Sequence, residues 1–233
     1  MRRLIPVAFL LLLAAAGSPA SANPAAEAEV AAIERLAVTA HWRESDARIE
    51  ALAPRLDELS TEQRQRLELI HLRNLGMAAR EREALDGFAE LLEEDLPPPL
   101  RVRVYTTAIS IAANVEDWPL AFTWLGEGLS HLNSARDEAG KLLGVASYLH
   151  TLVGEIPKAR ELALHGLELV QDLGDARALC QAVADVALAE DHARNFRVSE
   201  QWRYRQIKEC TRAGDLVFIA NGKYGVGKMA AAQ

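Results

Sequence analysis

A small residue recurs along this chain at a nearly constant spacing, once in each of five successive pairs of apolar segments. Around each of these positions, apolar residues return at the three- and four-residue intervals of an amphipathic helix. The positions are occupied by Ala47, Ala84, Ala121, Ala159 and Val198, at intervals that lengthen only slightly along the chain. Such a period holds two helices, and each hairpin can cover the apolar face of the one before it. We therefore expect an all-α fold, an α-solenoid of helical hairpins with a period of about 37 to 40 residues.

The clearest hairpin runs from Ala176 to Arg212. Its first half is rich in alanine, and its second half carries Val198, Trp202 and Ile207 at helical spacing after a polar break. The same stop signal stands before and after this hairpin, one period apart, as Leu173-Gly174-Asp175 and Ala213-Gly214-Asp215. Glycine is the residue that most often ends a helix. The repeated stop supports a periodic array of hairpins.

Local signals also mark where helices begin. Ser60-Thr61-Glu62-Gln63 has the composition of a capping box, in which Ser60 caps the helix and Gln63 reaches back. Pro97-Pro98-Pro99 is a rigid connection that cannot lie inside a helix, and the next helix follows it. Trp118-Pro119 begins a further helix, since proline is tolerated in a first turn.

The N-terminal segment, positions 1–22, is of a different kind. Arg2 and Arg3 give a basic start, the run from Leu4 to Ala16 is apolar, and Ala20-Ser21-Ala22 supplies small residues for cleavage. This is the layout of a secretory signal peptide. A retained anchor is the alternative, but the apolar run is shorter than the roughly 20 residues that cross a bilayer. We expect residues 1–22 to be a leader, residues 23–233 to be the repeat domain, and the mature protein to be periplasmic or secreted.

Charge limits the choice of partner. The chain has 26 basic and 33 acidic residues, and losing the two arginines of the leader lowers the net charge from −7 to −9. Binding to nucleic acid depends on neutralising phosphates, so an acidic protein of this kind argues against a nucleic-acid partner. No second long apolar run follows the leader. We expect contact with a membrane only through the leader before it is cleaved.

The sequence predicts no enzyme site. Gly222, Gly227 and Lys228 have the spacing of a phosphate-binding loop, but Met229 stands where a Ser or Thr should hold magnesium. We favour the other interpretation, in which residues 215–233 form the first helix of an incomplete sixth repeat. The six histidines show no i, i+4 pairing, and the two cysteines lack a catalytic context. We expect no catalytic residues, no cofactor and no metal site.

For the two cysteines, the sequence indicates a structural role and not a catalytic one. Cys180 and Cys210 are equally far from residue 195, where the last complete hairpin turns. In an antiparallel pair they lie near the same level, and an oxidising compartment favours a disulfide. Two small buried thiols are the alternative, because spacing alone does not give the direction of a side chain.

The second helices carry a family pattern. It combines the small residue of each repeat with two later positions, four and seven residues further on. These are occupied by Ala51, Phe88, Leu125, Ala163 and Trp202, and by Pro54, Leu91, Gly128, Gly166 and Arg205. The pattern resembles the tetratricopeptide repeat, although the period exceeds the usual length of about 34 residues. The resemblance covers about residues 27 to 233. The layout of a leader followed by stretched repeats also resembles the periplasmic sensory region of some bacterial diguanylate cyclases.

The tetratricopeptide resemblance implies a concave face lined by defined positions of the first helices. Transferred to this chain, the positions are Arg66, Leu69, Arg73, Arg103, Thr106, Ser110, Asn114, Lys141, Tyr148 and Thr151. A basic lining on an acidic protein favours an acidic or carboxylate-bearing peptide. We expect a binding module for a peptide or protein partner that has no catalysis of its own. The alternatives are the sensory region of a diguanylate cyclase of the GGDEF type, whose membrane span and catalytic domain are absent from this chain, and a purely structural assembly protein.

Overall fold

The computed structural model describes residues 24–39 and 41–230, so the leader lies outside the described residues. This part of the chain is helical and contains no strand. The α-helices are α1 (Pro24–Val38), α2 (Trp42–Leu52), α3 (Thr61–Met77), α4 (Glu81–Glu93), α5 (Pro98–Asn114), α6 (Trp118–Ser130), α7 (Arg136–Leu152), α8 (Ile156–Val170), α9 (Ala176–His192), α10 (Phe196–Ala213) and α11 (Leu216–Ala230). Two short 3-10 helices, η1 (Ala53–Glu58) and η2 (Leu132–Ser134), follow α2 and α6.

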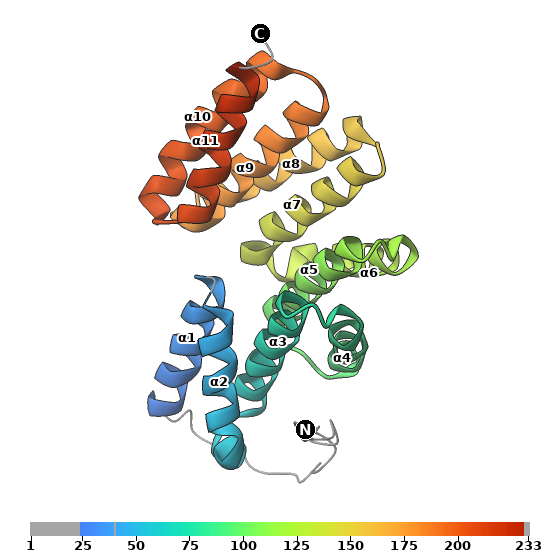
Figure 1. The fold of residues 1–233 in the computed structure, drawn as a ribbon. Helices are drawn as coiled ribbons and strands as arrows, with labels where there is room; N and C mark the ends of the chain where they lie inside the picture. Colours follow the sequence, from blue (N-terminus) through green and yellow to red (C-terminus); the bar gives the residue numbers. More distant parts are fainter. Residues whose placement is uncertain (1–23, 40, 231–233) are drawn as a thin grey trace, which may run out of the picture.

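The helices stack in chain order into a curved array (Figure 1). From α1 to α10, each odd-numbered helix pairs with the even-numbered helix that follows, most extensively in the α9–α10 and α7–α8 hairpins. Each hairpin also packs on the next one, for example where α8 meets α9 and α5 meets α7. The all-α solenoid of tetratricopeptide-like hairpins is therefore confirmed. None of the described helices combines the length and the apolar character needed to cross a membrane.

The last described helix decides between the two interpretations of the C-terminal glycines. Residues 216–230 form α11, which packs on α10 as the first helix of a further repeat would. Gly222 and Gly225 are buried inside this helix, where each lets α11 approach α10 closely. The phosphate-loop interpretation is wrong, because no loop is present to surround a phosphate.

The small residues of the middle repeats lie where the period predicts. Ala84, Ala121 and Ala159 are fully buried, and they hold α4, α6 and α8 against their partner helices. Four residues further on, Phe88 and Leu125 are buried in the largest apolar cluster, which extends from α3 to α8. The tetratricopeptide pattern is thus followed closely in the centre of the array.

The pattern at the two ends is shifted by one or two residues from the predicted positions. Ala47 is exposed and Val198 is 41% exposed, whereas Ser45 and Ser199 are completely buried. Serine fits these sites because its hydroxyl finds a partner: Ser199 Oγ donates to the carbonyl of Ala187 at 2.9 Å. The corrected later positions are Ile49 and Leu52 in α2, and Arg203 and Gln206 in α10.

Most helix ends follow the predicted signals, but α5 begins at Pro98, within the proline run and not after it, because proline is tolerated in a first turn. The Gln63 backbone N–H donates to Ser60 Oγ at 3.2 Å, and the Ser60 N–H donates to Gln63 Oε1 at 3.0 Å, which completes the capping box of α3. Gly214 ends α10 with a φ of 68°, a left-handed conformation that glycine adopts without strain. Asp175 caps α9 by accepting hydrogen bonds from the first turn.

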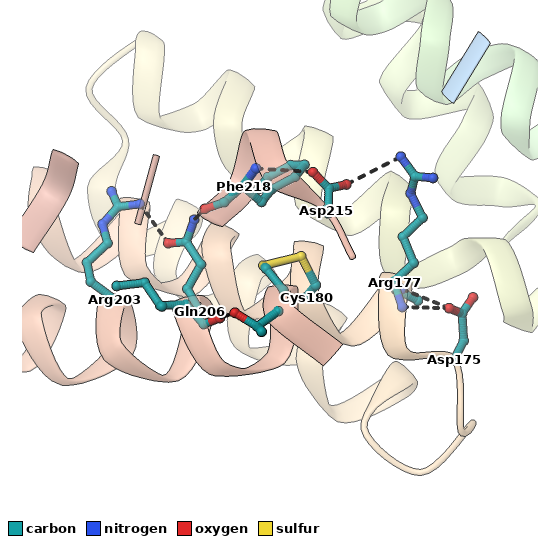
Figure 2. The surroundings of a disulfide bond; sticks show 11 residues. Asp175, Arg177, Cys180, Arg203, Gln206, Asp215 and Phe218 are labelled. Atoms are coloured by element: carbon teal, nitrogen blue, oxygen red, sulfur yellow. Dashed lines mark hydrogen bonds and ion pairs between the residues drawn. A yellow bond between two sulfur atoms is a disulfide. The ribbon is translucent and has the colours of Figure 1, made fainter. Parts of the chain in front are cut away.

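A disulfide joins Cys180 of α9 to Cys210 of α10, the pair that the spacing predicted (Figure 2). The two Cα atoms are 4.7 Å apart, and both cysteines are completely buried. The bond therefore links the two helices of the last complete hairpin through its interior.

Candidate functional site: the inner face

The first helices of the hairpins meet one another on the inside of the curve. From α1, Glu34 contacts arginines of both α3 and α5, and the carbonyl of Val38 contacts Arg177 of α9. Residues 38 and 177 belong to the first and fifth hairpins, so only the inside of the array can bring them together. We call the surface that these first helices turn inward the inner face.

The predicted binding residues fall on the first helices with different exposures. Most are half-buried, which suits side chains that line a surface and remain accessible; these are Arg66, Arg73, Arg103, Thr106, Ser110, Lys141 and Tyr148. Leu69 and Thr151 are buried in the array, and Asn114 is exposed at the end of α5.

Acidic residues of α1 neutralise part of the basic lining. Arg66 binds Glu34 through Nε at 3.1 Å and Nη2 at 2.6 Å, and its Nη1 contacts Glu27 at 2.7 Å. Arg103 Nη2 shares Glu34 at 3.2 Å. These arginines lower the pKa of the Glu34 carboxyl against the opposing effect of burial. Because Glu27 and Glu34 are seven residues apart on one helix face, their sequence spacing was the signal that could have revealed them.

Several other predicted residues are occupied within their own helices. The hydroxyl of Thr106 donates to the carbonyl of Val102 at 2.7 Å, and that of Ser110 donates to the carbonyl of Thr106 at 2.9 Å. Lys141 Nζ contacts Glu138 at 2.9 Å. The two hydroxyl protons are therefore used in the helix, and only their oxygens remain available to a partner.

Arg73 is different. Its half-buried guanidinium has no hydrogen bond or ion pair with any other residue that the structure describes. Burial, reinforced by the positive charges of Arg177 and Arg103, lowers the pKa of Arg73. The side chain thus carries hydrogen-bond donors that the described part of the chain does not satisfy.

Asp185 of α9, which packs against α7, is a second titratable group without a partner among the described residues. Burial raises the pKa of its carboxyl to about 7. The carboxylate packs over Gly144 of α7, where an added Cβ would lie 2.2 Å from Asp185 Oδ2. Glycine at position 144 therefore leaves the space that Asp185 occupies. The contact between Gly144 and Asp185 could not be predicted from the sequence, because an isolated acid in an alanine-rich helix has no distinctive pattern.

Outside the inner face, one hollow of about 370 Å³ is lined by Leu132, Asn133, Ala139, His165 and Leu169. The hollow lies between η2, α7 and α8, and His165 is a titratable side chain of its lining. Within the described residues, no three His, Cys, Asp or Glu side chains are placed so that they could hold a metal ion.

Comparison with known proteins identifies the fold. No family model and no curated protein matches the chain. Solved structures do: a Rap protein complexed with competence and sporulation factor is similar with a TM-score of 0.63 and 13% identity, covering 89% of this chain and 60% of the Rap chain. Aspartyl phosphate phosphatase F from Bacillus subtilis is similar with a TM-score of 0.61 and 8% identity, over 86% of this chain and 52% of that one.

A putative kinesin light chain of Podospora anserina with nearly identical tetratricopeptide-like repeats is also similar. Its TM-score is 0.56 with 10% identity, and the match covers 81% of this chain and 95% of that chain. The chain spans about 60% or less of the length of the Rap protein and of aspartyl phosphate phosphatase F. At these identities the shared property is the fold, a solenoid of tetratricopeptide-like helical hairpins. The resemblance to diguanylate cyclase sensory regions stays a prediction from sequence layout.

Proposed function

We propose that this chain is an exported binding protein that holds a peptide or protein segment on its inner face and has no catalysis of its own. The observation that supports this most directly is that the half-buried Arg73, on which the charges of Arg103 and Arg177 act, has no partner among the described residues. Leaving such groups unpaired costs stability, which a bound ligand recovers. A protein of the same fold has been solved in complex with competence and sporulation factor, which supports the use of this architecture for binding.

The charge of the face supports a partner with acidic groups. Of the arginines that line it, Arg66 and Arg103 are neutralised by α1, whereas Arg73 is not. On a chain with net charge −7, this local excess of positive charge favours carboxylates near Arg73.

Site-specific cross-linking tests the binding face. A photoreactive phenylalanine analogue replaces Tyr148, which lies half-buried on α7, or Tyr204, which is 57% exposed on α10 away from the inner face. We expect the analogue at position 148 to capture a defined partner from an extract of the exporting cells, and the analogue at position 204 not to. Equal capture at both positions, or capture at position 204 alone, contradicts the proposal.

Export is tested separately. Oxidative folding is required for the disulfide between Cys180 and Cys210, which agrees with a compartment outside the cytosol. We propose cleavage after Ala22, so N-terminal sequencing of the periplasmic or secreted protein should begin at Asn23. A protein that keeps Met1 and remains in the membrane fraction contradicts this part of the proposal.

A further inference from the structure

Three arginines from different hairpins converge where the first hairpin meets the fifth. Arg103 Nη2 donates to Glu34 at 3.2 Å, and Arg177 Nη2 donates to the carbonyl of Val38 at 2.7 Å. Glu34 and Val38 are separated by one helical turn of α1, a rise of about 6 Å. The guanidinium groups of Arg103 and Arg177 therefore both contact the last two turns of α1, and both act electrostatically on Arg73 of α3.

The acids nearby are already engaged. Glu34 is bound by Arg66 through both of its oxygens, and it shares one of them with Arg103. A further acid, Asp215, lies 3.3 Å from Arg177 (Figure 2). Within the described residues, these ion pairs engage Arg66, Arg103 and Arg177, and they leave Arg73 without an acidic partner.

Unused donors remain on all three arginines. The side chains of Arg103 and Arg177 each use one terminal nitrogen in the contacts above, and Arg73 uses none. A guanidinium offers two parallel N–H groups, a geometry that matches a carboxylate. The unused donors of the three side chains match the acceptor geometry of a carboxylate.

We propose that Arg73, Arg103 and Arg177 form a carboxylate-binding site, which takes an acidic side chain or the C-terminal carboxylate of a peptide. The proposal rests on the proposed function, because the peptide lies on the inner face. Arg73 supplies the charge that the chain leaves unpaired, while Arg103 and Arg177 are oriented by Glu34 and the Val38 carbonyl. A peptide bound here touches the first, second, third and fifth hairpins together.

The test uses three N-acetylated tripeptides: triglutamate amide as the side-chain probe, triglutamine with a free C-terminal carboxylate as the C-terminal probe, and triglutamine amide as the neutral counterpart. Binding to the oxidised protein, expressed without the leader, is measured by isothermal titration calorimetry at low ionic strength. We expect triglutamate to bind and Arg73→Met to weaken it about tenfold or more, the effect of losing charge-assisted hydrogen bonds. The matched control is Arg64→Met, on the exposed side of the same helix, which should leave the affinity unchanged.

A second measurement, the melting temperature without peptide, distinguishes a loss of binding from a loss of folding. Arg73 is a partly desolvated cation with no acidic partner among the described residues, so Arg73→Met in the absence of peptide should melt at the same temperature as the wild type or higher. Unchanged triglutamate affinity in folded Arg73→Met overturns the site. Equal weakening by Arg64→Met and Arg73→Met also overturns the site, because it shows that triglutamate is attracted by the general positive charge of α3 and not by a specific arginine.

The site and the proposed function can fail independently. If cross-linking at position 148 captures a partner and Arg73→Met changes neither that capture nor triglutamate binding, the carboxylate site is wrong and the binding face stands. If triglutamate binding depends on Arg73 but no partner is captured at position 148, the site stands and the proposed function fails.

Discussion

The second hairpin and the last complete hairpin use the same three positions for opposite kinds of side chain. In α4 the positions hold Ala84, Phe88 and Leu91, which are at most 2% exposed. In α10 they hold Ser199, Arg203 and Gln206, which are also buried, at 7% exposure or less. The backbone arrangement of a hairpin is therefore kept while its interior changes from apolar to polar.

The polar interior of the last hairpin is organised by hydrogen bonds (Figure 2). Arg203 Nη1 donates to Gln206 Oε1 at 2.9 Å, and Gln206 Nε2 donates to the carbonyl of Phe218 in α11 at 2.8 Å. Gly225 of α11 lies directly against Arg203, where a Cβ would be 2.7 Å from Nε. The α10–α11 contact thus depends on glycines that expose backbone to polar side chains.

The difference shows two ways of fixing the same hairpin. The second hairpin is stabilised by burial of large apolar groups, a contribution of about 1.5–3 kcal/mol for each side chain such as Phe88. The last hairpin buries fewer large apolar groups in its second helix and contains the disulfide between Cys180 and Cys210. We infer that the covalent bond compensates for the polar interior.

The largest expected effect is in the central core. Phe88→Ala removes a completely buried ring from the apolar cluster of α3 to α8, and it should lower the free energy of unfolding by about 3–5 kcal/mol. Urea denaturation measures this loss. The control is Phe196→Ala, which truncates a ring that is 43% exposed at the start of α10 and should cost far less. Equal losses of stability for both variants contradict the conclusion that burial of large apolar side chains stabilises the centre of the array.

The disulfide should have the next largest effect, confined to the C-terminal region. The bond closes a loop of 30 residues, which corresponds to roughly 3–4 kcal/mol in the chain-entropy model. The double variant Cys180→Ala, Cys210→Ala should therefore accelerate amide hydrogen exchange in α9, α10 and α11 and leave α4 nearly unchanged. Adding a reductant to the wild type should reproduce the effect, and adding it to the double variant should do nothing. An equal loss of hydrogen-exchange protection along the whole chain contradicts the conclusion that the disulfide stabilises only the C-terminal region.

The sequence predicted the parts of the fold that depend on repetition. The period located the buried Ala84, Ala121 and Ala159 because a large residue at such a position would separate the two helices. It misplaced the anchors at both ends, since Ser45 and Ser199 are polar residues whose burial depends on hydrogen-bond partners in other helices. Hydrophobicity alone cannot reveal such partners.

The inner face was predictable only in part. Helical spacing placed Arg66, Arg73 and Arg103 on the first helices, and all three are half-buried there. Their electrostatic differences come from contacts between distant hairpins, such as that of Arg177 with the carbonyl of Val38, 139 residues away. Because curvature accumulates from small rotations between successive repeats, the sequence does not indicate which residues meet across the array.

The pH dependence of stability should also distinguish the two regions, with a smaller effect. Burial raises the pKa of Asp185 from 3.8 to about 7, so between these values the native state binds a proton that the unfolded chain has released. Stability from this group is greatest at low pH and falls as the pH rises toward 7. We expect Asp185→Asn to melt a few degrees above the wild type at pH 8, and this gap to shrink at pH 5. The melting temperatures of the two proteins across this range provide the test; a gap that is constant with pH contradicts the raised pKa.

The smallest expected effect concerns Arg203, the polar counterpart of Phe88. Burial lowers the pKa of this guanidinium, and its Nε has no hydrogen-bond partner within the described residues. Arg203→Met keeps an unbranched side chain of similar length, removes a costly buried charge and leaves Gln206 Oε1 without its donor. Because these contributions oppose each other, the free energy of unfolding should change by less than about 1 kcal/mol.

The matched comparison for this variant is Gln206→Met. Gln206 joins α10 to α11 through the carbonyl of Phe218 and also accepts from Arg203 Nη1, so its loss leaves a buried donor unpaired and should cost about 1–3 kcal/mol. Urea denaturation of both variants, with the disulfide intact, separates the two roles. If Arg203→Met costs as much as Gln206→Met or more, then the arginine itself stabilises the last hairpin, and the polar interior does not need the disulfide to compensate for a buried charge.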